Sequence, residues 1–136
     1  PPGTISPIST ILLHLALGED SFITAIQAAN QTCWKAGGWS ARLGVTRLPE
    51  KGGAWREFKQ SSLPLAALME YLHSVHLLTN GCLSRLSEQD LEKHVSFGET
   101  SMTVADVLCI LVVHGAHHAG EIASLRGMQG ARGLPF

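Results

Sequence analysis

The chain has 136 residues and a formal net charge of −1, and 45% of its residues are hydrophobic and 15% charged. This is the length of one domain, with enough apolar residues for a buried core. The charge balance excludes the strongly basic surface of most nucleic-acid-binding proteins, and it excludes an acidic disordered tail. Because charged residues make up about a quarter of typical soluble domains, the low share suggests a surface partly covered by a partner.

The N-terminus shows no signal peptide and no initiator Met, which indicates a processed chain or a fragment. No uninterrupted apolar run approaches the roughly 20 residues of a membrane span. Cys33, Cys82 and Cys109 are odd in number and widely spaced, so neither a disulfide framework nor a thiolate zinc site is expected. Cys109 lies in an apolar run and is expected to be buried. A reducing cytoplasm fits this cysteine usage best.

The first predicted helix runs from Ser6 to about Asn30. Ser6 suits the N-cap and Pro7 the first helical position. The stretch 11–17 is apolar nearly all round apart from His14, which predicts burial on more than one side. A stripe of apolar residues recurs at helical spacing: Ile8, Ile11, Leu12, Leu15, Phe22, Ile23 and Ile26.

Residues 31–61 predict a long ordered connection with short helical turns, since they hold two Gly-Gly pairs and Pro49. Connections of this length inside a compact domain are often functional. The connection also contains all three tryptophans of the chain: Trp34, Trp39 and Trp55. These side chains could line the mouth of a pocket above the helices, or they could form a small core of the connection's own.

The second helix is expected from about Leu63 to Leu86, capped by Ser61 or Ser62 and started by Pro64. Its expected core face consists of Leu65, Leu68, Leu72, Val75, Thr79, Leu83 and Leu86, and Gly81 is a weak point. The polar stretch that follows can start a short turn of helix at residues 87–90.

The third helix is expected from Thr103 to about Arg126. Thr103 and Asp106 form a capping-box pattern, and Gly127 is the expected C-cap. No useful alternation of polar and apolar residues predicts a strand anywhere in the chain. The sequence therefore predicts an all-α fold, an up-down bundle with three long helices and a long Trp- and Gly-containing connection.

Three of the seven histidines lie within five residues: His114, His117 and His118. Residues four apart share one face of a helix, so His114 and His118 can direct their rings at a single ion, whereas His117 lies round the helix from them. The shared face also carries Val107, Leu111 and Leu125 and is expected to turn toward the core.

His14 is the candidate third ligand, because it is the single polar side chain of the stretch 11–17. A site of three histidines leaves a position open for water or substrate, which is typical of a catalytic metal. The alternative is that the buried histidines are hydrogen-bonded core residues without a metal.

The segment Val112–Ala123 contains His114-Gly115-Ala116-His117-His118-Ala119-Gly120-Glu121 and resembles the signature helix of the DinB/YfiT-like superfamily. The usual form there is His-x-x-His-His-Arg-Gly-Gln followed by an apolar residue. The N-terminal segment up to Asp20 is similar to the family's second helix with its first metal-binding histidine. Residues 125–136 are similar to the ending of one branch. The resemblance covers most of the chain, strongly in the two histidine segments and weakly between them.

The resemblance implies a four-helix bundle with a divalent metal held by His14, His114 and His118. It also implies a metal-dependent enzyme acting on a small molecule, either a hydrolase that activates water or a transferase that uses a low-molecular-weight thiol such as mycothiol or bacillithiol. The alternative is a non-catalytic interaction or stress protein with a vestigial or structural metal site. Zinc is the default metal because it is common; nickel, iron, copper and manganese are the alternatives.

Two positions depart from the family pattern, Ala119 in place of Arg and Glu121 in place of Gln. Loss of the Arg removes a possible anion contact. Glu121 could act as a base, could accept a hydrogen bond from a ligand imidazole, or could be a surface residue that pairs with Arg126 or His117, which we favour. His117 is a further candidate for the surroundings of the site.

One acid and three other histidines are further candidates for the site. Glu19 falls within the apolar stripe of the first helix and is either a site carboxylate or, as we favour, a buried structural acid. His73, His76 and His94 are expected outside the site.

The resemblance further implies that the family's first helix is missing, so that residues 1–136 form one N-terminally incomplete domain. Three helices would leave an apolar face open, and large open apolar faces favour self-association. We therefore expect a homodimer in which the partner covers the gap, with neither nucleic acid nor membrane as a partner.

Overall fold

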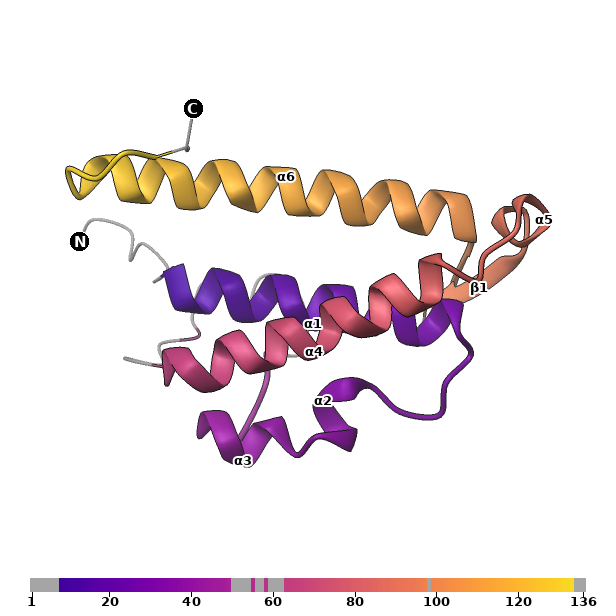
Figure 1. Cartoon of the computed structure of the whole chain (residues 1–136), viewed down its shortest axis with the longest axis horizontal. Helices are drawn as coiled ribbons and strands as arrows, with labels where there is room; N and C mark the ends of the chain where they lie inside the picture. Colours follow the sequence, from indigo (N-terminus) through magenta and orange to yellow (C-terminus); the bar gives the residue numbers. More distant parts are fainter. Residues whose placement is uncertain (1–7, 50–54, 56–57, 59–62, 98, 134–136) are drawn as a thin grey trace.

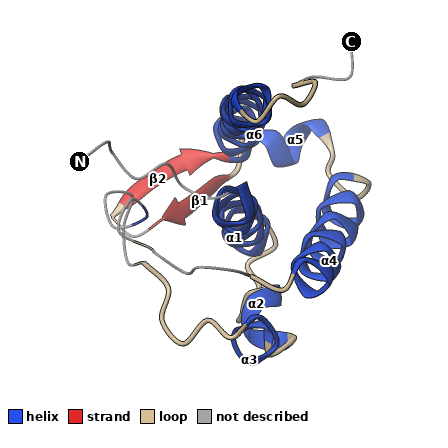
Figure 2. Ribbon diagram, turned by 90° about the vertical axis from the view of Figure 1, so that its left-hand side faces the viewer, coloured by secondary structure: helices blue, strands red, loops and turns tan. Residues whose placement is uncertain are grey.

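The computed structural model describes residues 8–49, 55, 58, 63–97 and 99–133. The elements in chain order are α1 (Ile8–Ile26), α2 (Cys33–Ala36), α3 (Trp39–Leu43), α4 (Leu65–Leu83), α5 (Glu88–Leu91), β1 (His94–Phe97), β2 (Thr100–Thr103) and α6 (Val104–Met128). Three of them are long helices, and α1 lies between α4 and α6 (Figures 1 and 2). The predicted all-α class is confirmed. The expected caps at Ser6, Pro7, Ser61 and Ser62 lie outside the described residues.

Helix α1 is packed on several sides, as its apolar stretch predicts. It ends at Ile26 instead of Asn30, because Ala28 has a φ of +50° that no helical residue adopts. Its buried line is shifted from the predicted stripe and comprises Leu13, Ala16, Asp20 and Ile23, together with Thr10 and Ile11. Periodicity could not identify the most buried line, since apolar residues surround much of the helix.

The connection after α1 forms the two short helices expected of it, and it contributes to the main core. Trp34 and Trp39 are buried, and each ring centroid lies 5.3 Å from that of Tyr71 on α4. The core also includes Leu13, Ala16, Leu43, Val45, Leu63, Leu68 and Val75. Two of the three tryptophans therefore join the connection to the helices instead of lining a pocket mouth.

Helix α4 is shorter than predicted, and its buried face matches the predicted one only in part. Pro64 occupies the N-cap, one position before the first helical residue Leu65. Leu65 and Leu83, expected in the core, are 61% and 43% exposed. Leu68 and Val75 are buried as predicted, and Tyr71 and Cys82 complete the buried face. The face that packs on α1 and α3 was set by Tyr71, whose large ring fills the space beside both tryptophans.

A short turn and a hairpin lead from α4 to α6. Helix α5 begins after Ser87, whose side chain forms a capping box with Asp90, so the expected turn of helix is present. The antiparallel pair β1–β2, with His94 opposite Thr103, was not predicted. Strands of four residues are too short for an alternating pattern to stand out. The hairpin contacts α1 through Phe97, whose ring lies 4.8 Å from that of Phe22.

Helix α6 begins as predicted, with Thr103 as N-cap and a capping box to Asp106. It continues to Met128, with Gln129 as C-cap, so Gly127 lies inside the helix and the prediction of a cap there is wrong. The glycine that takes the left-handed conformation is Gly130, at φ +77°. The prediction that Cys109 is buried is also wrong, since this residue is exposed.

The side of α6 turned away from α1 is bare and apolar. Val112 and Val113 are 73% and 68% exposed, and α4 also exposes large apolar residues. Although no uninterrupted apolar run reaches membrane length, α6 is long and apolar enough to cross a membrane by length and composition alone, with a mean hydropathy of 1.2. Such a surface favours a covering partner. The homodimer inferred from the sequence stays a prediction.

Candidate metal centre

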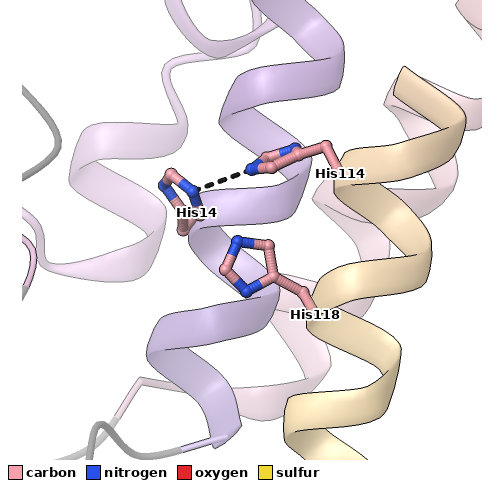
Figure 3. A group of neighbouring side chains, drawn as sticks. All are labelled: His14, His114 and His118. Atoms are coloured by element: carbon pink, nitrogen blue, oxygen red, sulfur yellow. Dashed lines mark hydrogen bonds between the residues drawn. The ribbon is translucent and has the colours of Figure 1, made fainter. Parts of the chain in front are cut away.

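The three histidines expected as ligands come together between α1 and α6 (Figure 3). His14 Nε2 and His114 Nε2 are 3.0 Å apart, within hydrogen-bond distance. The ring of His118, one turn further along α6, has its centroid 4.9 Å from that of His14 and 4.7 Å from that of His114. One ring nitrogen from each residue lies within 4.8 Å of the others, and all three residues are partly buried. Spacing and tertiary packing thus produce one cluster.

Local packing directs the two α6 histidines toward α1. Val107 and Leu125, on the same face before and after them, are buried, and the two helices run in opposite directions (Figure 1). On the α1 side, Gly18 follows His14 by one turn. A Cβ atom at Gly18 would lie 3.1 Å from Cε1 of His114, which is tighter than most real contacts. Because Gly18 has no side chain, the His114 ring can pack directly against α1 at this position.

We expect Gly18→Ala to weaken metal binding about tenfold, because the added methyl group displaces the His114 ring by a few tenths of an ångström. The matched control is Gly115→Ala, since a Cβ atom at Gly115 meets nothing within 4 Å. Both substitutions favour the helix by about 1 kcal/mol. The measurement is zinc affinity by chelator competition. Equal affinities in the two variants would show that Gly18 has no such role.

Burial favours the neutral form of two of the three histidines, His14 and His114. It lowers the pKa of His14 to about 4, with further lowering from His114 and His118 and an opposing effect of Glu121. Burial also lowers the pKa of His114, followed by the effects of His118 and His117. A neutral imidazole has the free lone pair that a metal requires, so protons compete weakly at these two residues near pH 7.

The donor set fits a divalent transition metal. Imidazole nitrogens suit zinc, copper, iron and nickel, and three of them leave at least one coordination position for a further ligand. Helix α1 belongs to the buried core, and the packing of α6 on α1 brings the three rings together. His14, His114 and His118 are the residues that would hold the metal.

A tryptophan from the connection also reaches the cluster. The Trp55 ring lies edge-on to that of His14, with centroids 4.9 Å apart and an angle of 64° between the planes, and it contacts Phe58 as well. Neither of the two predicted uses describes the tryptophans, since Trp34 and Trp39 belong to the main core and Trp55 packs against His14. Nothing in the local sequence distinguishes Trp55 from them, because its partner is 41 residues away.

Adjacent acids on α1 have separate structural roles. Glu19 accepts a hydrogen bond from Thr79 Oγ1 at 2.5 Å and lies 3.2 Å from His76 Nε2, so it joins α1 to α4. The role of Asp20 was not predicted from the sequence. Asp20 is buried and accepts hydrogen bonds from Tyr71 and from two backbone N–H groups of α2. Its helical spacing from Ala16 and Ile23, which are also buried, is the one sequence feature that indicates a buried acid at this position.

His117 and Glu121 surround the cluster on α6. His117 is exposed, with its ring 5.1 Å from that of His118. Together with Cys109, Ile110, Val113 and His114 it lines a groove of about 410 Å³ along the helix. Glu121 Oε2 lies 2.8 Å from His118 Nδ1. Glu121 lies on the surface, as favoured, but its direct contact is with His118, a candidate ligand imidazole, and the Arg126 side chain donates to Gly133.

The remaining histidines lie apart from the cluster, as expected. His73 and His76 are exposed on α4. His94 is exposed on β1, where its Nδ1 lies 3.1 Å from Ser101 Oγ.

A helical bundle in which two helices bring three imidazoles together has the fold and the donor set of a candidate metal site. The chain is a member of the DinB superfamily, whose family model matches residues 1–122. The predicted resemblance is confirmed.

Two curated relatives have names that mention a metal. A protein of Bacillus cereus named "putative metal-dependent hydrolase" is 37% identical over 81 residues, which cover 57% of this chain and 46% of the relative. A protein of the same name from Bacillus anthracis is 36% identical over the same length, with the same coverage. The chain thus spans about half the length of the curated relatives it matches.

Proposed function

We propose that this protein is a metal-dependent enzyme in which His14, His114 and His118 hold a divalent ion, with hydrolysis of a small molecule as its reaction. The convergence of three imidazoles from two packed helices carries the proposal, and burial lowers the pKa of two of them, His14 and His114. The names of the Bacillus relatives support the same class of reaction. Zinc is the first metal to test.

A divalent metal bound here would supply the chemistry, since it lowers the pKa of a bound water or thiol and polarises a substrate. The chain's own residues would hold and orient it. Trp55 packs against the His14 ring and would help to hold its orientation. The groove beside His114 has an apolar lining of Cys109, Ile110 and Val113, which suits an apolar part of a substrate.

The proposal is tested by the metal content of protein purified without nickel resin. We expect about one equivalent of metal by elemental analysis, or uptake of about one equivalent of zinc on titration. Less than about a tenth of an equivalent with no uptake would overturn the proposal and favour the non-catalytic bundle.

Activity separates the two kinds of enzyme. The zinc-loaded protein is assayed against a panel of aryl esters and amides, and in parallel with a low-molecular-weight thiol plus an electrophilic acceptor. Turnover that a chelator removes and zinc restores in the first assay supports a hydrolase. Turnover confined to the second assay would replace the hydrolase by a thiol transferase.

A further inference from the structure

Glu121 contacts the Nδ1 edge of the His118 ring. Its Oε2 lies 2.8 Å from His118 Nδ1, three residues earlier on α6. The His118 side chain is 16% exposed and that of Glu121 is 42% exposed. The imidazole is therefore mostly shielded from water while the carboxylate remains hydrated, so the cost of burying its charge is small.

The contact determines which nitrogen of His118 is available to a metal. A carboxylate only accepts hydrogen bonds, so Nδ1 must carry the proton that is donated to it. In a neutral imidazole the other nitrogen, Nε2, then has the free lone pair. Because the His118 ring packs against the rings of His14 and His114, Nε2 is the atom left for the shared site.

The charge of Glu121 adds to this effect. The other groups that would surround the ion are neutral imidazoles, since burial lowers the pKa of both His14 and His114. A carboxylate that accepts from a ligand imidazole makes that imidazole more basic and offsets part of the ion's charge. The nearest basic side chain along the helix, Arg126, instead donates to the backbone carbonyl of Gly133.

We propose that Glu121 is a positioning residue that holds His118 as an Nε2 ligand and strengthens metal binding through it. This inference rests on the proposed function, because it concerns the same three-histidine site. It assigns the carboxylate to the orientation of a ligand and not to a base at the reacting atoms.

Three variants test the proposal. Glu121→Ala removes the acceptor, and we expect zinc affinity to fall 10- to 100-fold, as is typical when a hydrogen-bond partner of a metal ligand is lost. Glu121→Gln keeps an acceptor oxygen without the charge, and we expect a loss of about three- to tenfold. Glu70→Gln is the control, since Glu70 is an exposed carboxylate that pairs with Arg42 on a distant surface.

A double-mutant cycle shows whether the effect passes through His118. In a His118→Ala background, Glu121→Ala should change zinc affinity by less than twofold. A loss that persists in this background would mean that Glu121 acts on the ion independently, and would overturn the proposal. So would a zinc affinity of Glu121→Ala within twofold of the wild type.

The tautomer of His118 gives a second measurement that does not depend on zinc. Long-range ¹H–¹⁵N correlation spectra should show His118 protonated at Nδ1 in the wild type, with and without zinc, and a mixture of tautomers in metal-free Glu121→Ala. An Nε2-protonated His118 in the wild type would overturn the proposal even if no metal binds, and absence of metal binding alone would overturn only the proposed function.

The number of zinc ions bound per chain tests whether Glu121 is itself a metal ligand. His117, His118 and Glu121 also offer ligand atoms within 4.8 Å of one another. Binding of two zinc equivalents by the wild type, with one lost in Glu121→Ala, would show that Glu121 is itself a ligand and would overturn the positioning role.

Discussion

Replacing His14 by alanine should abolish most of the zinc affinity. His14 supplies one of three nitrogens in the cluster, and no other histidine of the described chain lies where it could substitute on the α1 side. We expect a loss greater than the roughly 10- to 100-fold typical for an outer hydrogen-bond partner, because a direct ligand is removed. Chelator competition measures this affinity, with His73→Ala, an exposed histidine of α4, as the control.

Stability provides a second measure of the same loss. Zinc at about 100 times its dissociation constant should stabilise the wild type by about 2.7 kcal/mol, since the ion binds only the folded chain. The His14→Ala protein should gain almost none of this at the same zinc concentration. An unchanged zinc affinity of His14→Ala would show that the third ligand is another residue.

Replacing Asp20 by alanine should have the largest effect on folding, a loss of about 3–5 kcal/mol in the free energy of unfolding. The carboxylate is buried and accepts hydrogen bonds at 2.8 Å from the Cys33 and Trp34 backbone and from Tyr71 Oη. Without it, these donors are left in the core without partners, each at a cost of about 1–3 kcal/mol, partly relieved by entering water. Asp20→Asn keeps one acceptor oxygen and should lose about half as much.

The neighbouring acid is the matched control for this experiment. Glu19 is one residue away on the same helix, and its contacts are with Thr79 and His76 near the surface. Glu19→Gln should cost less than about 1 kcal/mol. Urea unfolding followed by circular dichroism measures all three variants. An Asp20→Ala protein within 1 kcal/mol of the wild type would contradict the structural role of the carboxylate.

Asp20 and Glu19 also illustrate a limit of helical periodicity. Adjacent residues point about 100° apart on a helix, so which of two neighbouring acids is buried depends on where the surrounding elements pack. Because α1 has apolar residues on several sides, its sequence is compatible with more than one buried line. In the structure the face that carries Asp20 is buried, because two backbone N–H groups of α2 and the Tyr71 hydroxyl donate hydrogen bonds to this carboxylate.

The wrong predictions of burial for Leu65, Leu83 and Cys109 have a related cause. Each is apolar and lies on a predicted core face or apolar run, but α4 packs on α1, α2 and α3, α6 packs mainly on α1, and both helices leave one side uncovered (Figure 2). Hydrophobicity alone does not say whether a residue faces the core of its own chain or a surface that another molecule covers.

The sequence by itself determined what depends on nearby residues. The capping box of Thr103 and Asp106 formed as predicted because it needs partners only three residues apart. His114 and His118 share a face because four residues make about one helical turn. Only the tertiary structure joined His14 to that pair and Trp55 to His14, and decided which carboxylate lies in the core. Those contacts link residues far apart in the chain, and they depend on which helices pack together and at what rotation, information that no local pattern holds.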